Sequence, residues 1–145
     1  MPETSVKLLQ CAVARSGLLR IDRIGSGVGV ILYDTARKIG AGLHILAPHS
    51  GTIHPENPVM YANTAIPFVL GRLESDGGKR PLSVAIAGGA SMMGREDKPN
   101  AGAKVVEAVK AALAGAGLQV KLDQTGGAQI RSIVLDIDAG KIKIG

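Results

Sequence analysis

The stretch from Ile24 to Pro48 constrains the fold more than any other part of this chain. It begins with a turn of small residues, GSGVG at 25–29, and continues into two β-rich apolar runs, 30–33 and 43–46, which a polar, glycine-containing link joins. Two such runs predict a hairpin of buried strands. A turn without bulky side chains lets a ligand or another chain approach the backbone closely. Because His44 lies in the second run, we expect a pocket at this turn.

Length and composition predict one soluble domain, residues 1–145. A chain of 145 residues can bury a full core, and 46% hydrophobic with 20% charged residues is typical of a globular protein. The one cysteine, Cys11, excludes an internal disulfide and fits a reducing compartment. No apolar run approaches the ~20 residues that span a bilayer, and the first ten residues carry no signal pattern. We therefore expect a cytoplasmic protein without membrane insertion.

The net charge of +5 does not predict nucleic-acid binding. Lys and Arg are scattered along the chain, and no run of them exceeds two residues. The chain has one Phe, two Tyr and no Trp, so it lacks the stacking aromatic residues of single-strand binders. The five-residue spacing of His44, His49 and His54 matches neither a helix face nor a hairpin pair, and no cysteine or carboxylate cluster joins them. We therefore expect no metal and no cofactor.

The remaining pattern predicts an α+β fold. Strands are expected at 6–13, 18–24, 82–87, 118–122, 133–137 and 141–144, and helices at 60–75 and 101–114. We expect Asn63 and Asn100 to cap the two helices, and Pro67 is tolerable in its helix if it lies within the first turn. The alternation of Lys and Ile in the last strand predicts one solvent-exposed face. The order strands, helix, strand, helix, strands predicts a sandwich of largely antiparallel β-sheet with two main helices.

Five short phrases occur along the chain in one order and register. They are Gly25-Ser26 with Leu32-Tyr33-Asp34, HILAP at 44–48, YANTAI at 61–66, Gly88-Gly89-Ala90 followed by Met92, and Gly126-Gly127 followed by Arg131. Together the phrases resemble the family of CheD, a bacterial chemoreceptor glutamine deamidase, over nearly the whole chain. The resemblance implies a CheD-like sandwich. It also implies a binding surface formed by Gly25, Ser26, Gly88, Gly89, Gly126, Gly127 and Arg131.

The resemblance also implies a reaction and a site. In the family, a cysteine thiolate attacks the side-chain amide of a receptor glutamine, a histidine activates the thiolate and protonates the leaving amine, and water resolves the thioester. His44 occupies the position of the catalytic histidine. Gly27 stands at the position of the nucleophilic cysteine, and Ile21 at that of a catalytic threonine. The resemblance therefore implies a site that keeps one of three catalytic residues.

Two functional hypotheses follow from this degenerate site. Removing the nucleophile from such a constellation costs on the order of a millionfold in rate. The first hypothesis is therefore a non-catalytic binding module for chemoreceptor helices or for a CheC-type phosphatase. The second is an active glutamine deamidase that uses Cys11 or Ser26 as the nucleophile with His44.

The sequence around Cys11 and Ser26 favours neither as a substitute nucleophile. Cys11 is expected to be a small buried hydrophobic residue, because no cationic neighbour in the local sequence would lower its pKa. Ser26 is expected to point away from Gly27, to the opposite face of an extended chain. We also expect Gly27 to line the surface, so that the variant Gly27→Cys would fold.

Overall fold

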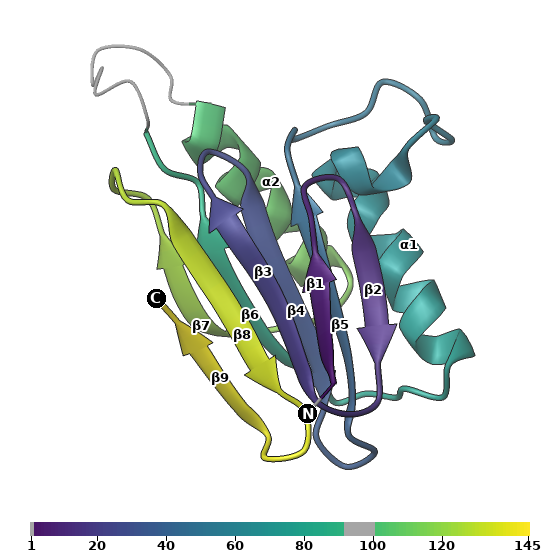
Figure 1. Cartoon of the computed structure of the whole chain (residues 1–145). Helices are drawn as coiled ribbons and strands as arrows, with labels where there is room; N and C mark the ends of the chain where they lie inside the picture. The colour runs from purple at the N-terminus through teal and green to yellow at the C-terminus, as the bar shows by residue number, and fades with distance from the viewer. Residues whose placement is uncertain (1, 92–100) are drawn as a thin grey trace.

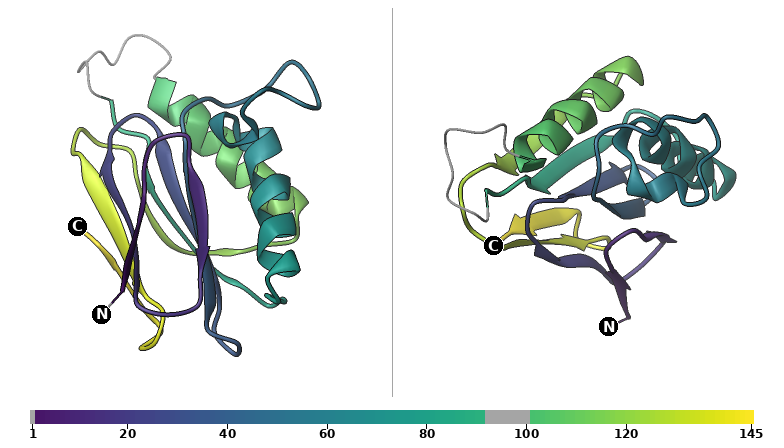
Figure 2. Two further views of the ribbon diagram at one scale, coloured as in Figure 1. Left: turned by 45° about the vertical axis from the view of Figure 1, so that its right-hand side comes forward. Right: turned by 90° about the horizontal axis from the view of Figure 1, so that it is seen from above.

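Two β-sheets pack face to face, and two helices cover the outer face of one sheet (Figures 1 and 2). The computed structural model describes residues 2–91 and 101–145. One sheet contains, in spatial order, β1 (Glu3–Val6), β3 (Leu18–Ile24), β8 (Arg131–Asp136) and β9 (Lys141–Ile144). The other contains β2 (Cys11–Ala14), β5 (Ile39–Ile45), β4 (Val28–Asp34), β6 (Ser83–Gly88) and β7 (Val120–Thr125). The helices are α1 (Ala62–Ser75), which follows a 3-10 turn at Pro58–Met60, and α2 (Ala101–Gly115).

This architecture confirms the predicted α+β class. Of the seven strand pairings in the described residues, only β1–β3 and β6–β7 are parallel, so the sandwich is largely antiparallel as expected. Neither described helix is long and apolar enough to cross a lipid bilayer. In each parallel pair, a crossover connection separates the two strands in the chain, as parallel pairing requires.

The five-stranded sheet is covered on both faces, so every residue of β4 and β5 is buried. On one face, alternate side chains such as Leu32 and Leu43 pack against the helices. On the other face, Ile31 packs against side chains of the four-stranded sheet such as Leu19. A sheet buried on both faces requires near-continuous apolar runs. This requirement explains the two apolar runs of the hairpin, which the structure confirms.

The first helix buries the apolar stripe that its spacing predicts, namely Ile66, Val69, Leu70 and Leu73. The predicted Asn63 cap is wrong, because Tyr61 is the N-cap residue and Asn63 already lies in the first turn. There its Oδ1 accepts a hydrogen bond from the backbone N–H of Ser50 (2.8 Å). Pro67 is the sixth residue of α1, beyond the first turn, so its missing N–H removes one helical hydrogen bond. Asn100 and Met92 lie outside the described residues.

The predicted strand at 6–13 is wrong, because the chain changes sheets within it. β1 pairs with β3 in one sheet, whereas β2 pairs with β5 in the other. Between them Leu9 has a φ of +67°, and its backbone N–H donates to the carbonyl of His44 (2.9 Å). Because both strands carry apolar residues, the sequence pattern runs through this turn without a visible break. The turn therefore places residues 7–10 beside the end of β5.

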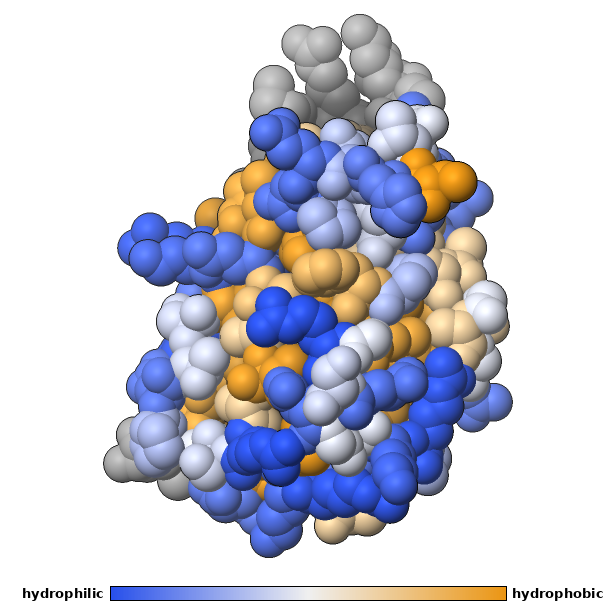
Figure 3. Space-filling model, turned by 90° about the vertical axis from the view of Figure 1, so that its right-hand side faces the viewer, coloured by the Kyte–Doolittle hydropathy of each residue, from blue (hydrophilic) through white to orange (hydrophobic). Residues whose placement is uncertain are grey.

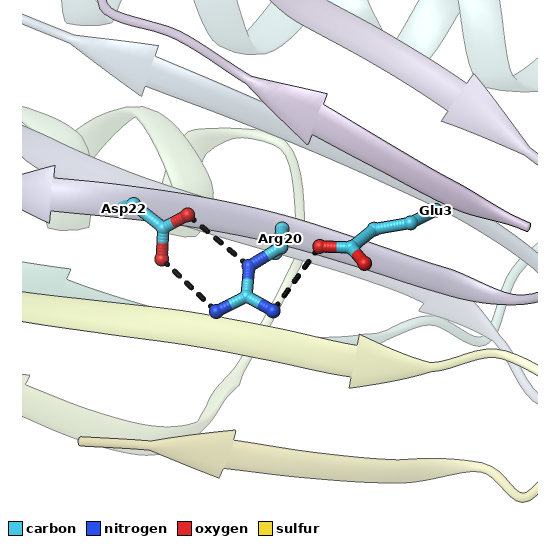
Figure 4. Close-up of polar contacts among 3 residues, drawn as sticks. All are labelled: Glu3, Arg20 and Asp22. Carbon is cyan, nitrogen blue, oxygen red and sulfur yellow. Dashed lines mark hydrogen bonds and ion pairs between the residues drawn. The ribbon is translucent and has the colours of Figure 1, made fainter.

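The outer face of the four-stranded sheet is polar. In β9 the two lysines are exposed and the two isoleucines half-buried, as predicted. Nearby, Arg20 of β3 forms ion pairs with Glu3 of β1 and with Asp22, each at 3.1 Å (Figure 4). Ion pairs this exposed contribute little to stability. Their effect is to order the surface between β1 and β3.

Candidate functional site

Three glycine turns meet at one end of the molecule, the upper end in Figure 1. The backbone N–H of Gly89 donates to the carbonyl of Gly27 (2.7 Å), and that of Gly126 donates to the carbonyl of Gly88 (2.9 Å). Two further bonds run from Ala90 N to Gly25 O (3.0 Å) and from Ser91 N to Gly127 O (2.8 Å). We refer to these turn residues as the glycine cluster: Gly25, Ser26, Gly27, Gly88, Gly89, Gly126 and Gly127. The structure thus brings together the predicted binding residues of all three turns.

The absence of side chains permits this close approach. A Cβ on Gly88 would collide with the carbonyl oxygen of Gly27, and the φ of Gly88 is +118°, a conformation that favours glycine. Gly27 differs, because its φ lies outside the left-handed region. A Cβ on Gly27 would instead lie 2.5 Å from the carbonyl oxygen of Ile45. The predicted surface position of Gly27 is therefore wrong: Gly27 is buried against the end of β5.

His44 projects from β5 into the space between the two sheets. It lies opposite Gly29 of β4 in an antiparallel pair, so the two residues face the same side of the sheet. That side faces the other sheet, because a Cβ on Gly29 would contact Ile21 and Ile24 of β3. Only 3% of His44 is exposed, and its Nδ1 has no hydrogen-bond partner in the described part of the chain. Burial lowers the pKa of the imidazole below its usual value, so His44 is neutral at pH 7.

The three positions that the resemblance predicts to be catalytic, Ile21, Gly27 and His44, lie around the pair formed by Gly29 and His44. A Cβ on Gly27 would lie 3.4 Å from His44 Nε2. Ile21 is fully buried, and two of its methyl groups lie 3.3 and 3.4 Å from where a Cβ on Gly29 would be. At these three positions the one polar side chain is the imidazole. The arrangement can donate or accept a proton, but Gly27 and Ile21 provide neither a nucleophile nor a hydroxyl.

Cys11 lies on the opposite face of the five-stranded sheet from His44. It pairs with Leu43, and both side chains pack in the cluster that faces the helices. Leu43 and His44 are consecutive residues of one strand, so their side chains point to opposite faces. Burial raises the pKa of the Cys11 thiol, and the nearby guanidinium of Arg72 offsets only part of this effect. The thiol is therefore separated from the imidazole by the sheet and is mostly protonated at neutral pH.

Ser26 occupies a bend, not an extended segment. The residues from Gly25 to Gly27 connect β3 to β4 without strand geometry, and Ser26 is half-buried. The alternation of a strand therefore does not fix the direction of its side chain, and the argument that Ser26 faces away from Gly27 does not apply here. Ser26 is the hydroxyl nearest in sequence to the position of the missing nucleophile.

Arg131 begins β8 at the glycine cluster. It pairs with Ile24 of β3 and precedes the buried Ile133 by two residues, so its side chain leaves the sheet on the inner face. Its Nη2 lies 3.8 Å from the position that a Cβ on Gly127 would take. The Nε atom of Arg131 is buried and has no hydrogen-bond partner within residues 2–91 and 101–145. A cationic side chain with an unused donor therefore lies beside the third glycine turn.

Sequence reasoning missed three exposed apolar side chains near the site, Leu8, Leu46 and Ile130. Each adjoins in sequence a residue already described: Leu8 adjoins Leu9, Leu46 adjoins Ile45 and Ile130 adjoins Arg131. We refer to Leu8, Leu46 and Ile130 as the apolar rim. The sequence position of Ile130 beside the third glycine turn could have indicated that its side chain is exposed near the site. The exposure of Leu8 and Leu46 depends on the change of sheet at residues 7–10 and on the end of β5, which the pattern did not reveal.

The two other histidines lie away from His44. His49 and His54 belong to the loop after β5, and His54 lines a groove of about 760 Å³ together with Ile53 and Phe68. On the face of the molecule that carries α1, apolar residues are interspersed with polar ones, and polar residues dominate its lower part (Figure 3). Within the described residues, no three His, Cys, Asp or Glu side chains lie close enough to hold a metal ion.

Comparison with known proteins bears directly on the predicted family. The sequence profile described as "CheD chemotactic sensory transduction" matches residues 46–145. A probable chemoreceptor glutamine deamidase CheD of Methanococcus vannielii is 40% identical over 123 residues, which cover 83% of this chain and 80% of the relative. The chemoreceptor glutamine deamidase CheD of Thermotoga maritima is 38% identical over 122 residues, which cover 83% of this chain and 76% of the relative.

A third relative extends the similarity across the site. The probable chemoreceptor glutamine deamidase CheD of Methanococcus maripaludis is 33% identical over 141 residues, which cover 96% of this chain and 92% of the relative. So long a match includes both Gly27 and His44, which the profile match leaves out. The profile match and the matches to individual relatives confirm the resemblance that the five phrases indicated. The chain belongs to the CheD family.

Proposed function

We propose that this chain is a non-catalytic member of its family, a cytoplasmic module that binds chemoreceptors without deamidating them. The observation that carries the proposal is the pairing of Gly27 with His44. The position from which a cysteine would face the imidazole at 3.4 Å from Nε2 carries no side chain. The scaffold of a glutamine deamidase is thus combined with a site that lacks its attacking atom.

The chemistry of amide hydrolysis supports a non-catalytic role. A side-chain amide is a poor electrophile, so the reaction depends on an activated nucleophile such as a thiolate. A neutral His44 has the protonation state of a general base, but Gly27 gives it no proton to remove. Loss of the nucleophile alone lowers the rate by roughly a millionfold. His44 would then serve binding through a hydrogen bond from its imidazole.

A second candidate function is slow deamidation with Ser26 as the nucleophile. The position of Ser26 in a bend next to Gly27 favours it over Cys11, whose thiol faces the helices on the far side of the sheet. A serine hydroxyl needs an adjacent base to become nucleophilic, and His44 is the base that this end of the molecule offers. The experiment below includes this candidate.

Three features support binding at the glycine cluster. The third turn exposes backbone at Gly127, the apolar rim offers exposed hydrophobic contact, and Arg131 adds a cationic donor. Apolar residues that border a polar centre are typical of protein interaction surfaces. The names of the relatives describe proteins that act on chemoreceptors, so chemoreceptor helices are the proposed partner. A CheC-type phosphatase is the second partner class to test.

The test combines a binding and a turnover assay on the same samples. The purified chain is mixed with a chemoreceptor cytoplasmic fragment that carries glutamine at its modification sites, and calorimetry measures affinity. Mass spectrometry of the fragment and released ammonia measure deamidation, with the Thermotoga maritima relative as the active reference. We expect binding with no turnover above background. Turnover that Ser26→Ala or Cys11→Ala abolishes would overturn the proposal and establish an enzyme.

Variants of the apolar rim locate the binding surface. Leu46→Glu and Ile130→Glu place a charge at the rim and are expected to weaken binding at least tenfold, a loss of about 1.4 kcal/mol. Leu122→Glu is the matched control, because Leu122 is equally large and exposed but lies in the middle of β7. If all three variants bind alike, the rim is not the interface. The same series is repeated with a CheC-type phosphatase.

A further inference from the structure

We propose that Arg131 anchors a carboxylate of the partner, so that the module binds the glutamate form of a chemoreceptor site in preference to the glutamine form. This inference rests on the proposed function, because it assumes that a chemoreceptor segment docks at the glycine cluster. It goes further by naming the chemical state that the module recognises. The module would report that a receptor has been deamidated instead of deamidating it.

Among the described residues, no acidic side chain forms an ion pair with Arg131. The ion pairs found within residues 2–91 and 101–145 involve Arg20, Arg37 and Lys110, not Arg131. The Nε of Arg131 is nevertheless buried, so water does not take the place of a partner there. A buried donor on a cation is costly unless an acceptor reaches it. An anionic ligand would remove this cost.

The geometry at the third turn leaves room for such a ligand. Gly126 and Gly127 both have a positive φ, and nothing lies within 4 Å of the position that a Cβ on Gly126 would take. The guanidinium therefore adjoins an open stretch of backbone beside Gly127. Because Gly126 bonds to Gly88, and the turn of Gly88 bonds to that of Gly27, the third turn is in backbone contact with the rest of the glycine cluster. A segment docked at Gly126 and Arg131 would therefore lie beside the other two turns.

A carboxylate fits the guanidinium of Arg131 better than an amide does. A guanidinium has only donors, and its fork matches the two oxygens of a carboxylate in a bidentate, charge-assisted contact. A glutamine amide offers one oxygen and leaves its NH₂ group facing a cation. No group at Gly27 or Ile21 discriminates in favour of the amide.

The experiment uses two chemoreceptor fragments that differ only in glutamine or glutamate at the modification sites. We expect the intact chain to bind the glutamate fragment roughly tenfold more tightly, the effect of one additional charge-assisted hydrogen bond. Arg131→Gln is expected to remove this preference, because it weakens binding of the glutamate fragment far more than binding of the glutamine fragment. Arg131→Lys keeps the charge without the fork and is expected to retain only part of the preference.

Lys141→Gln is the matched control, since it removes an exposed positive charge at the far end of β9. Thermal unfolding of each variant checks that the fold is kept. Equal affinity for the two fragments, or equal preference in Arg131→Gln and in the intact chain, overturns the inference and leaves the proposed function standing. Failure to bind either fragment overturns both.

Discussion

At the residue scale, the carbonyl oxygen of Ile45 obstructs any side chain on Gly27. A Cβ there would lie 2.5 Å from this oxygen, closer than a normal contact, and a backbone atom cannot rotate away. The glycine is therefore matched to its surroundings even though its φ would suit other residues. Placing a cysteine at this position would require β5 or the turn to shift.

The first prediction concerns Gly27→Cys. We expect this variant to lose about 1–3 kcal/mol of unfolding free energy, as overpacked sites do. For a domain of this size the loss corresponds to a fall in Tm of roughly 3–10 °C, measured by thermal unfolding. We expect deamidation of receptor fragments to stay far below that of the active relative, because Ile21 supplies no hydroxyl.

Gly51→Cys is the matched control for this prediction. Gly51 lies in the loop after β5, and nothing lies within 4 Å of the position of its Cβ. Its Tm should therefore stay within about a degree of the parent, as for other unstrained surface changes. A Gly27→Cys variant as stable as this control would show that the turn relaxes freely and that the steric argument is wrong.

The second prediction concerns the pH dependence that His44 imposes on stability. Burial lowers the pKa of His44 in the folded chain, so the unfolded chain binds a proton more readily. The stability that the buried, neutral His44 contributes is therefore fully present above about pH 6.5, the usual pKa of an unfolded histidine. This stability is lost as the pH falls toward the lower pKa of His44 in the folded chain. The slope is at most about 1.4 kcal/mol per pH unit.

Urea unfolding at pH 7.5 and at pH 5.5 measures this effect. We expect His44→Gln to show a smaller difference in unfolding free energy between the two pH values than the parent chain. His54→Gln serves as the control, because His54 is exposed in the loop. The argument fails if His44→Gln and the parent show the same pH dependence.

At the scale of elements, Asp34 joins the central hairpin to the start of β6. Its carboxylate is 1% exposed and accepts hydrogen bonds from the backbone N–H groups of Ala36 (3.1 Å), Arg37 (3.1 Å) and Lys79 (2.9 Å). The guanidinium of Arg37 adds a further contact at 3.1 Å. Burial alone would raise the pKa of this carboxyl, but the hydrogen bonds from Lys79 and Arg37 outweigh it and lower the pKa.

The third prediction follows from this arrangement. Asp34→Asn replaces one charged acceptor oxygen with an NH₂ group that would face backbone donors, so it is expected to cost about 1.5–3 kcal/mol. Chemical denaturation measures the change, and the exposed Glu56→Gln is the control with the same loss of charge. A cost below that of a typical surface substitution, about 0.5 kcal/mol, would contradict the assignment of Asp34 as a structural anchor.

The sequence predicted helices and strands correctly where the hydrophobic pattern lies within one short segment. The hairpin, both helices and the closing pair β8–β9 follow from patterns within about 15 residues, and each is present. Two errors share a different cause. The change of sheet at residues 7–10 and the N-cap of α1 at Tyr61 depend on contacts with β5 and with the loop before the helix. Such contacts leave no periodic signal in the segment itself.

At the scale of the whole molecule, the site depends on contacts between turns that are far apart in sequence. Gly27 and Gly126 are separated by about a hundred residues, yet the turn of Gly88 bonds to both turns. Strand order produces this meeting, because β4, β6 and β7 are neighbours in one sheet. Glycine phrases and their resemblance to a family could therefore predict the members of the cluster. They could not predict that Gly27 is buried, or that Cys11 faces the helices.

The fourth prediction uses this layout to locate the docked receptor on the surface. Hydrogen–deuterium exchange of the chain is measured with and without a chemoreceptor fragment. We expect slower exchange at residues 7–10, 25–29 and 126–131, the parts of the molecule that carry the apolar rim, the first glycine turn and Arg131. Turns and short loops normally exchange by local opening, so binding there should change their protection more than that of the buried strand β4.

A second surface makes this measurement decisive. The groove of about 760 Å³ beside the start of α1 carries the exposed Ile53 and Phe68 and offers an alternative hydrophobic contact. Protection at residues 50–58 and 63–68, with none at the glycine turns, would assign the receptor to the helical face. In that case the empty position at Gly27 would be irrelevant to binding. Protection at the glycine turns that Leu46→Glu removes and Phe68→Glu leaves unchanged would place the partner at the turn of Gly27, as the proposed function requires.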